Sequence, residues 1–411
     1  MGSYELGVWK YLRENDIKYD IVVGTSIGSL NGALMTYDAY DEAVSLWENV
    51  NVNKVIRGGV NLPSDFLRND TFRKENYRKL VDLGKIYFKN KGVDITPFKE
   101  WVKTAIDPEK VKNSEITLGI VTTKYAGTKE IDLVAQDLPV EKIIPFLHAS
   151  SSCWPIFPME KIDGVLYIDG GWTNNLAIDF ALRLGADEVI AVMLPAFPRI
   201  PQKFDYTWLP NVKTIIPTRP LGTMMNFDNK VVNNNFKLGY LDACKAYGKL
   251  DGVKFTFEKD EKTEIYASKF ISILSKKYFE SFEGIAKKFT SLHGHYVPKS
   301  NKDFYLSALE YIGDNFSHDY YNIHKLDEFI EIILKGIKSL KANKKVASKH
   351  KTLMLTAPVS ESDKKAMIYR LYKDYIDAKI YAKLSLIMKN NPVAGAVLSL
   401  LEVLDQEGKL S

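Results

Sequence analysis

The stretch VVGTSIGSLNGAL (residues 22–34) decides the fold. An apolar run ends at Gly24, a single serine follows at Ser26, and after Gly28 the sequence becomes helical in character. This G-x-S-x-G pattern between a strand and a helix is the setting of a nucleophile elbow. The two glycines permit a turn so tight that the serine takes a strained backbone conformation and presents its hydroxyl at the sheet edge. An ordinary strand-to-helix turn with a capping serine produces the same pattern, so both interpretations stay open.

A second stretch, GVLYIDGGWTNN (residues 164–175), offers a base for this serine. Asp169 stands at the carboxyl end of a predicted buried strand, where parallel α/β sheets carry their functional residues. Gly170 and Gly171 let the backbone turn at once, which leaves the carboxylate free to face the end of another strand. The alternative is a turn aspartate that satisfies its own backbone.

The histidines fit a catalytic triad poorly. The chain has six, and the order Ser–Asp–His requires one after Asp169. His148 precedes the aspartate, and the next two, His293 and His295, fall in a lysine-rich region of helical pattern. We expect His148 to be a structural residue near the end of a helix, where the helix dipole favours it. A hydrolase with a histidine triad is therefore the weaker interpretation.

The first 250 residues predict an α/β fold. Near-continuous apolar runs bounded by turn residues are typical of strands buried on both faces, and they favour a mostly parallel central sheet. Residues 36–114 lack clear strands and are rich in aromatic side chains, so we expect helices and loops there. The predicted strands are YDIVV (19–23), EITLGIVTT (115–123), KEIDLV (129–134), GVLYID (164–169) and DEVIAVML (187–194).

Composition narrows the class of protein. The 411 residues are 45% hydrophobic and 26% charged, as in soluble globular proteins. Cys153 and Cys244 provide neither a disulfide framework nor a metal cluster, which indicates a reducing compartment such as the cytoplasm. No secretory leader or bilayer-spanning run is recognisable, so we expect a protein that is soluble or at most lies on a membrane.

The C-terminal region differs from the rest. We place a boundary after residue 258, with an α/β domain over 1–258 and a mainly helical region of unknown role over 259–411. Apolar positions in 367–389 recur at helical spacing. The net charge of +5 arises entirely in residues 251–411, with 26 basic and 21 acidic side chains, which is too little for nucleic acid. Seven lysines in 335–351 predict either contact with anionic lipid headgroups or a solvated helix and loop.

Taken together, these segments resemble the patatin-like phospholipase family, over about residues 2–250. ELGVWKYLRENDIKYDIVVGTSIGSLNGAL is similar to the family's helix, strand and elbow, and ASSSCWPIFPMEKIDGVLYIDGGWTNN matches its alanine–serine segment, Phe-Pro and D-G-G in order. The resemblance implies a three-layer domain in which Ser26 is the nucleophile and Asp169 the proton acceptor of a two-residue dyad. It implies no cofactor and no metal.

Two departures from the family stand out. Its members begin with a strand and a glycine-rich loop whose amides form the oxyanion hole, whereas here only the last glycine, Gly2, remains. The amide of Ile27, directly after the nucleophile, would supply one donor. We expect the natural protein to extend upstream of Met1. Ala177 replaces a common proline at a helix start, a change that should be tolerated.

The resemblance thus predicts a serine acyl hydrolase that cleaves fatty acyl esters of phospholipids or related lipids through an acyl-enzyme. The alternative is a catalytically silent relative that binds lipid or a partner protein, because an incomplete oxyanion hole would slow the reaction.

Overall fold

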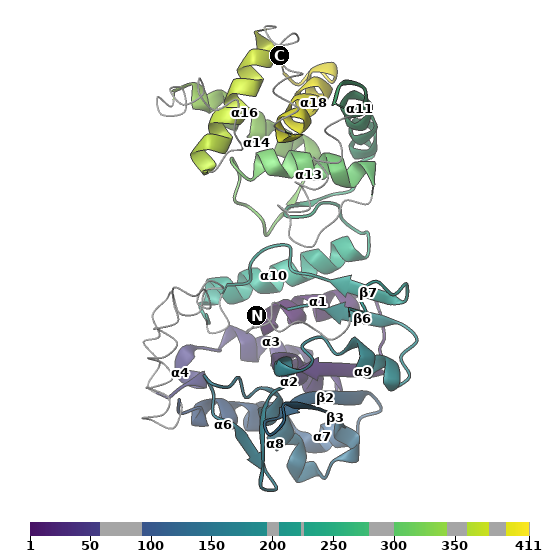
Figure 1. The fold of residues 1–411 in the computed structure, drawn as a ribbon, viewed down its shortest axis with the longest axis vertical. Coiled ribbons are helices and arrows are strands. Elements are labelled where there is room, and N and C mark those ends of the chain that lie inside the picture. The colour runs from purple at the N-terminus through teal and green to yellow at the C-terminus, as the bar shows by residue number, and fades with distance from the viewer. Residues whose placement is uncertain are drawn as a thin grey trace. The chain divides into compact units, whose positions relative to one another are not determined.

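The protein consists of two compact units, Met1–Ala246 and Tyr247–Ser411 (Figure 1). The computed structural model describes residues 1–57, 93–194, 205–222, 226–278, 300–342, 360–377 and 392–410. The division falls earlier than residue 258 because the segment after Ala246 folds with the second unit. There β8 (Thr256–Phe257) pairs in parallel with β9 (Ile323–His324).

The main sheet of the first unit is mixed. Its strands β1 (Ile21–Thr25), β2 (Thr117–Lys124), β5 (Val165–Asp169) and β4 (Glu160–Ile162) lie in that order, and β3 (Lys129–Val134) also pairs with β2. Only β1 and β2 run parallel; the β2–β3, β2–β5 and β4–β5 pairs are antiparallel. The expectation of a mostly parallel sheet was therefore wrong.

Two hairpins explain the mixed sheet. A short turn after Lys124 returns the chain from β2 to β3, and Gly127 and Thr128 there have φ of 79° and 47°. Asp163 and Gly164 join β4 to β5 with φ of 49° and 81°, as a two-residue hairpin turn requires. Strands joined by such short turns must be antiparallel, whereas an apolar run buried on both faces carries no sign of direction.

Helices cover both faces of the sheet beside the elbow. A Cβ built on Gly32 of α2 (Ile27–Met35) would come 3.0 Å from Val22 and 3.2 Å from Leu118. A Cβ on the next residue of β2, Gly119, would instead meet Phe180 of α9 (Ile178–Arg183) at 2.8 Å. Because successive strand residues face opposite sides, α2 and α9 pack on opposite faces.

Helix α1 (Gly2–Glu14) is anchored along α10 (Asn229–Ala246). The two backbones approach so closely that a Cβ on Gly7 would lie 2.0 Å from the Phe236 carbonyl oxygen, and one on Gly239 would lie 1.9 Å from that of Tyr4. This packing holds the N-terminal end of α1 in place. The other elements of this unit are α3 (Tyr40–Glu48), α4 (Val52–Val55), α6 (Thr96–Ala105), α7 (Pro108–Lys112), α8 (Val140–Ser150), and the parallel pair β6 (Val189–Val192) and β7 (Val212–Ile215).

All five predicted strands form, as β1, β2, β3, β5 and β6. The described parts of 36–114, residues 36–57 and 93–114, contain helices, as expected. No helix within the described ranges is both long enough and apolar enough to cross a membrane.

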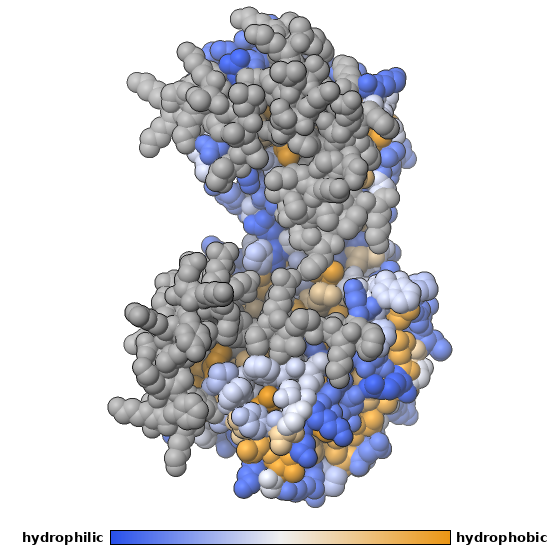
Figure 2. All heavy atoms as spheres, in the orientation of Figure 1, coloured by the Kyte–Doolittle hydropathy of each residue, from blue (hydrophilic) through white to orange (hydrophobic). Residues whose placement is uncertain are grey.

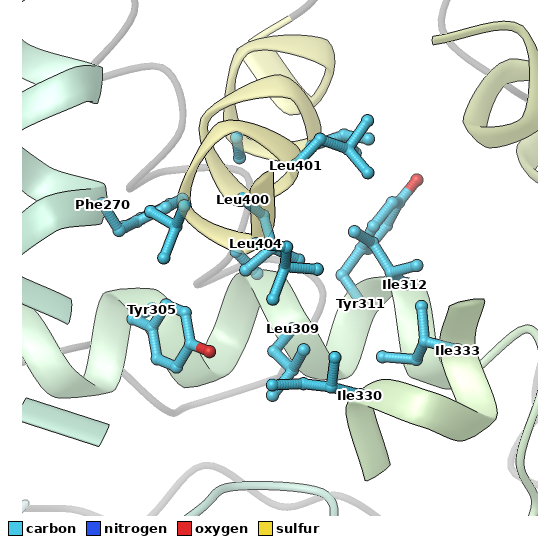
Figure 3. Close-up of a cluster of buried hydrophobic side chains, with 14 of the residues drawn as sticks. Phe270, Tyr305, Leu309, Tyr311, Ile312, Ile330, Ile333, Leu400, Leu401 and Leu404 are labelled. Atoms are coloured by element: carbon cyan, nitrogen blue, oxygen red, sulfur yellow. The ribbon is translucent and has the colours of Figure 1, made fainter. Parts of the chain in front are cut away.

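The second unit is mainly helical, as its sequence predicted. Its helices bury a continuous apolar core that includes Phe270, Tyr305, Leu309, Ile330 and Leu400 (Figure 3). The expected helix at 367–389 forms as the later part of α16, and its remaining residues lie outside the described ranges. The helices are α11 (Glu261–Tyr278), α13 (Asn301–Gly313), α14 (Leu326–Ser339), α16 (Glu361–Ile376) and α18 (Pro392–Gln406).

Candidate active site

Ser26 occupies a sharp turn between β1 and α2. The strand ends at Thr25, the helix begins at Ile27, and Ser26 between them has φ 56° and ψ −127°. A positive φ at a residue other than glycine is strained and persists only where the surroundings enforce it. Gly24 is essential to this turn, because a Cβ on it would lie 2.3 Å from the carbonyl carbon and oxygen of Gly28. Ser26 thus lies in a tight strand-to-helix turn, and its role as a nucleophile stays a prediction.

Asp169 is the last residue of β5 and is buried. Its Oδ1 accepts a 2.8 Å hydrogen bond from the amide of Gly171, in the short 3-10 turn that follows. Gly170 lies directly on β2, since a Cβ there would come 2.3 Å from the carbonyl oxygen of Val121. Oδ1 thus accepts a hydrogen bond within the local turn, and Oδ2 can accept one from a residue of another segment.

The sheet register brings the serine and the aspartate together. Thr25 pairs with Val121 and Asp169 pairs with the next residue, Thr122; both pairings lie on the same edge of β2, because β3 pairs with the other edge along Gly119–Lys124. The carboxyl ends of β1 and β5 therefore meet on this edge, and the Ser26 hydroxyl donates a 2.6 Å hydrogen bond to Asp169 Oδ2. A hydroxyl held on a buried carboxylate has the geometry of a nucleophile paired with its base.

The environment of Asp169 favours its protonated form more than water does. Burial raises the pKa of this carboxyl from 3.8 to about 6, while the hydrogen bonds from Ser26 and Gly171 act in the opposite direction. Burial disfavours the charged form because the protein interior solvates charge poorly. A carboxylate with a pKa near 6 is a stronger base than an ordinary aspartate and is still largely ionised at neutral pH.

The N-terminal ends of two helices meet beside Ser26. Ile27 begins α2 and Gly2 begins α1, and neither amide has a carbonyl acceptor within its own helix. The two residues touch, because a Cβ built on Gly2 would lie 2.7 Å from Ile27 Cγ1. Helix N-termini carry partial positive charge, so this position suits a developing oxyanion.

A polar cluster that the sequence analysis missed ties α1 to α2. The Asn31 amide donates to the Gly2 carbonyl oxygen at 3.1 Å and to Glu5 Oε2 at 2.6 Å. Its Oδ1 accepts the indole N–H of Trp47 at 3.0 Å. The only feature of the sequence that could have indicated this cluster is the position of Asn31, one helical turn after Gly28. Burial raises the pKa of Glu5 to about 7.

His148 is buried in the last turn of α8, against the ring of Phe98. Its Nε2 has no hydrogen-bond partner among the described residues. Burial, and then the positive charge of Lys99, lower its pKa to about 4. The structure places no acidic or serine side chain on this nitrogen, which agrees with a structural role. His293 and His295 lie outside the described residues.

A small apolar cavity lies beside the elbow helix. Its walls come from α2, α3 and α6 and include Ile27, Leu30, Trp47, Trp101, Val102 and Ile106. Ile27, the residue directly after Ser26, forms part of the cavity wall. The two cysteines are free and buried, and Cys153 lies in the segment that links α8 to β4.

The N-terminal part of the chain is similar to known proteins. Residues 1–182 match the model of the patatin-like phospholipase family. A patatin-like phospholipase domain-containing protein, ZK370.4 of Caenorhabditis elegans, is 29% identical over 199 residues, which cover 46% of this chain and 12% of that protein. Lysophospholipase NTE1 of Phaeosphaeria nodorum is 26% identical over 192 residues, 46% of this chain and 11% of its own. The chain therefore matches only about a tenth of the length of these curated relatives.

One solved structure also aligns with the chain. The crystal structure of VipD from Legionella pneumophila covers 100% of this chain and 90% of its own, at 13% identity and a TM-score of 0.40. A similarity this low supports no conclusion about either unit.

Proposed function

We propose that this protein is a serine acyl hydrolase that cleaves fatty acyl esters of phospholipids or related lipids, with Ser26 as nucleophile and Asp169 as proton acceptor. The observation that carries the proposal is the 2.6 Å hydrogen bond from Ser26 Oγ to Asp169 Oδ2 at a strained strand-to-helix elbow. The match of residues 1–182 to the patatin-like phospholipase family supports the same chemistry.

The reaction would run in two halves. In the first, Asp169 takes the hydroxyl proton while Ser26 Oγ attacks the ester carbonyl, and the proton then passes to the departing alcohol as the acyl-enzyme forms. In the second, Asp169 deprotonates a water that attacks the acyl-enzyme, and the fatty acid leaves as the proton returns to Ser26. No other base is required, which is consistent with the buried position of His148.

The oxyanion would be held at the N-terminal end of α2. The Ile27 amide is the donor proposed there, and Gly2, packed against Ile27, is proposed to correspond to the last glycine of the family's glycine-rich loop. Loss of one oxyanion donor typically lowers kcat by about 10²–10³-fold. A carboxylate is a weaker base for a hydroxyl than an imidazole, so the rate of this dyad depends strongly on these amides.

Apolar surroundings support a lipid substrate. The small cavity beside Ile27 has aliphatic and tryptophan walls of the kind that a lipid site needs, but it is too small to hold an acyl chain without movement of its walls. Figure 2 shows hydrophobic residues at the surface of the first unit, and Tyr125 and Leu166 are 41% and 40% exposed. Two fungal relatives are named lysophospholipases, which makes a lysophospholipid a suitable first substrate.

Membrane contact through 335–351 remains a prediction. Lys335, Lys338 and Lys341 belong to the described part of this stretch, and the lysines after residue 342 lie outside it. If the prediction is correct, replacing all seven lysines by glutamine lowers binding to anionic vesicles. Unchanged binding would contradict it.

The proposal is tested by labelling the full chain with a fluorophosphonate probe, mapping the adduct by peptide mass spectrometry, and measuring fatty acid release from a lysophospholipid. An adduct on Ser26, absent from Ser26→Ala, together with hydrolysis supports an acyl hydrolase. A folded chain that forms no adduct and releases no fatty acid would instead support a silent lipid-binding or interaction protein.

A further inference from the structure

Ser150, the last residue of α8, is fully buried beside the elbow. Its hydroxyl donates a 2.7 Å hydrogen bond to the Val121 carbonyl oxygen of β2 and accepts a 2.9 Å hydrogen bond from the backbone amide of Ser26. One side-chain oxygen therefore connects the central strand to the backbone of the proposed nucleophile.

The backbone of Ser26 needs such a partner. The chain leaves the β1–β2 ladder after Thr25, which pairs with Val121, so the Ser26 amide lies past the last paired residue. A buried amide without an acceptor is costly, and φ of 56° at a serine is costly as well. The Ser150 hydroxyl supplies the acceptor and fills the space between this amide and the Val121 carbonyl.

The same end of α8 also touches the acid. The Ser152 carbonyl oxygen accepts a 2.9 Å hydrogen bond from the Asp169 amide, and Gly170 lies against the Val121 carbonyl to which Ser150 donates. The two residues of the proposed dyad are thus both held by one short segment, which sets their relative position.

We propose that Ser150 is a positioning residue for Ser26: its hydroxyl fixes the elbow backbone so that Ser26 Oγ faces Asp169 and the Ile27 amide faces the reacting carbonyl. This inference rests on the proposed function and adds a residue to that site. The hydrogen bonds of the Ser150 hydroxyl go to the backbone of Val121 and of Ser26, so Ser150 acts on the site through the backbone alone.

Ser152 provides a matched control. It is as buried as Ser150, it lies two residues away, just after α8, and its hydroxyl donates to the His148 carbonyl oxygen in the last turn of α8 at 2.8 Å. Ser152→Ala removes an equivalent buried hydroxyl and keeps the backbone contact with Asp169. Any general effect of losing a serine hydroxyl at this helix end is therefore common to both variants.

The experiment compares the full chain with Ser150→Ala and Ser152→Ala by the rate of fluorophosphonate labelling at Ser26, by kcat and KM on a lysophospholipid, and by melting temperature. We expect Ser150→Ala to lower kcat and the labelling rate by about 10²-fold, as a small displacement of a reacting group does. KM and the midpoint of the pH profile should stay unchanged, because the hydroxyl meets neither substrate nor Asp169. Ser152→Ala should stay within about threefold of the unaltered chain.

If Ser150→Ala labels and turns over as fast as Ser152→Ala, the positioning role is overturned. If Ser150→Ala fails to fold, Ser150→Cys decides, because it keeps the volume and weakens the hydrogen bonds. Slowed labelling of a folded Ser150→Cys supports the role, and an unchanged rate overturns it. These outcomes differ from failure of the proposed function, in which the unaltered chain itself is neither labelled nor active.

Discussion

The Ser26 hydroxyl donates a 2.6 Å hydrogen bond to Asp169 Oδ2, although the two residues are 143 positions apart in the chain. The contact depends on β2, because its successive residues Val121 and Thr122 pair with Thr25 and Asp169 on the same edge. A slip of one residue in either pairing would move the hydroxyl or the carboxylate to the opposite face of the sheet. The contact between the two proposed catalytic residues therefore depends on strand register.

We expect Ser26→Ala to abolish both hydrolysis and fluorophosphonate labelling, because the alanine has no atom to acylate. Ser114→Ala is a suitable control, since the Ser114 hydroxyl donates to the Thr36 carbonyl oxygen before β2 begins. Fatty acid release and probe labelling measure the effect. Turnover by Ser26→Ala near the rate of the control would refute the assignment of Ser26.

Asp169→Asn should lower kcat by about 10²–10⁴-fold, the usual contribution of a general base. The amide keeps the shape of the side chain and still accepts the Gly171 amide hydrogen bond, so the elbow geometry should be preserved. Single-turnover kinetics with circular dichroism on the same sample separate lost chemistry from lost structure. A folded variant with an unchanged rate would show that another group takes the proton.

The pH profile should report Asp169. Burial raises its pKa to about 6, and the carboxyl must be ionised to accept the proton of Ser26. We therefore expect kcat/KM to rise with pH through a midpoint of about 6 and to level off above it. Initial rates on a neutral ester avoid titration of the substrate. A profile that falls over this range would be incompatible with Asp169 as the base.

The raised pKa of Asp169 also predicts that replacing its carboxyl by a neutral amide stabilises the folded protein. Because the folded pKa of about 6 lies above the ordinary value of 3.8, the folded state holds a proton over this range that the unfolded state has lost. The contribution of Asp169 to the free energy of unfolding is therefore full at low pH, and it is lost as the pH rises through about 6. At pH 8, Asp169→Asn should raise the free energy of unfolding by about 1–3 kcal/mol, measured by urea denaturation, with a smaller gain at pH 4. A loss of stability at pH 8 would contradict this account of the buried carboxylate.

The two glycines of the elbow should respond differently to alanine. Gly24→Ala would place a methyl group 2.3 Å from the Gly28 backbone, so we expect a loss of about 3 kcal/mol or failure to fold. A Cβ on Gly28 meets only the carboxylate end of Glu5 at 3.3 Å, so Gly28→Ala should change stability by less than about 1 kcal/mol. Thermal unfolding of the pair gives the comparison. Equal effects would mean that close backbone approach is not what Gly24 provides.

His148→Ala tests whether a histidine takes part. His148 is buried with its Nε2 unpartnered among the described residues, so we expect labelling at Ser26 to stay within about threefold and stability to fall by about 1–2 kcal/mol. Loss of labelling without loss of folding would revive a histidine-dependent mechanism. Phe98→Leu, which removes the ring packed on His148, serves as the control for packing.

Much of the fold was readable from the sequence because it depends on local chemistry. Apolar runs between turn residues identified β1, β2, β3, β5 and β6, and glycine spacing around Ser26 identified the elbow. Strand direction was not readable, because a strand buried on both faces has the same pattern in either orientation. The Asp-Gly turn at 163–164 was the available signal for the β4–β5 hairpin, and it indicates an antiparallel pair.

The sequence by itself determined the two candidate residues, since an elbow serine and a strand-end aspartate are specified by their immediate neighbours. Only the tertiary structure decided that Ser26 and Asp169 share a hydrogen bond, because this follows from the register of two strands on β2. It likewise decided the contacts of Ser150 and Asn31, whose partners lie up to 124 positions away in the chain. Serine and asparagine are common in helices and loops, and only the arrangement of neighbouring elements shows which backbone groups their side chains satisfy.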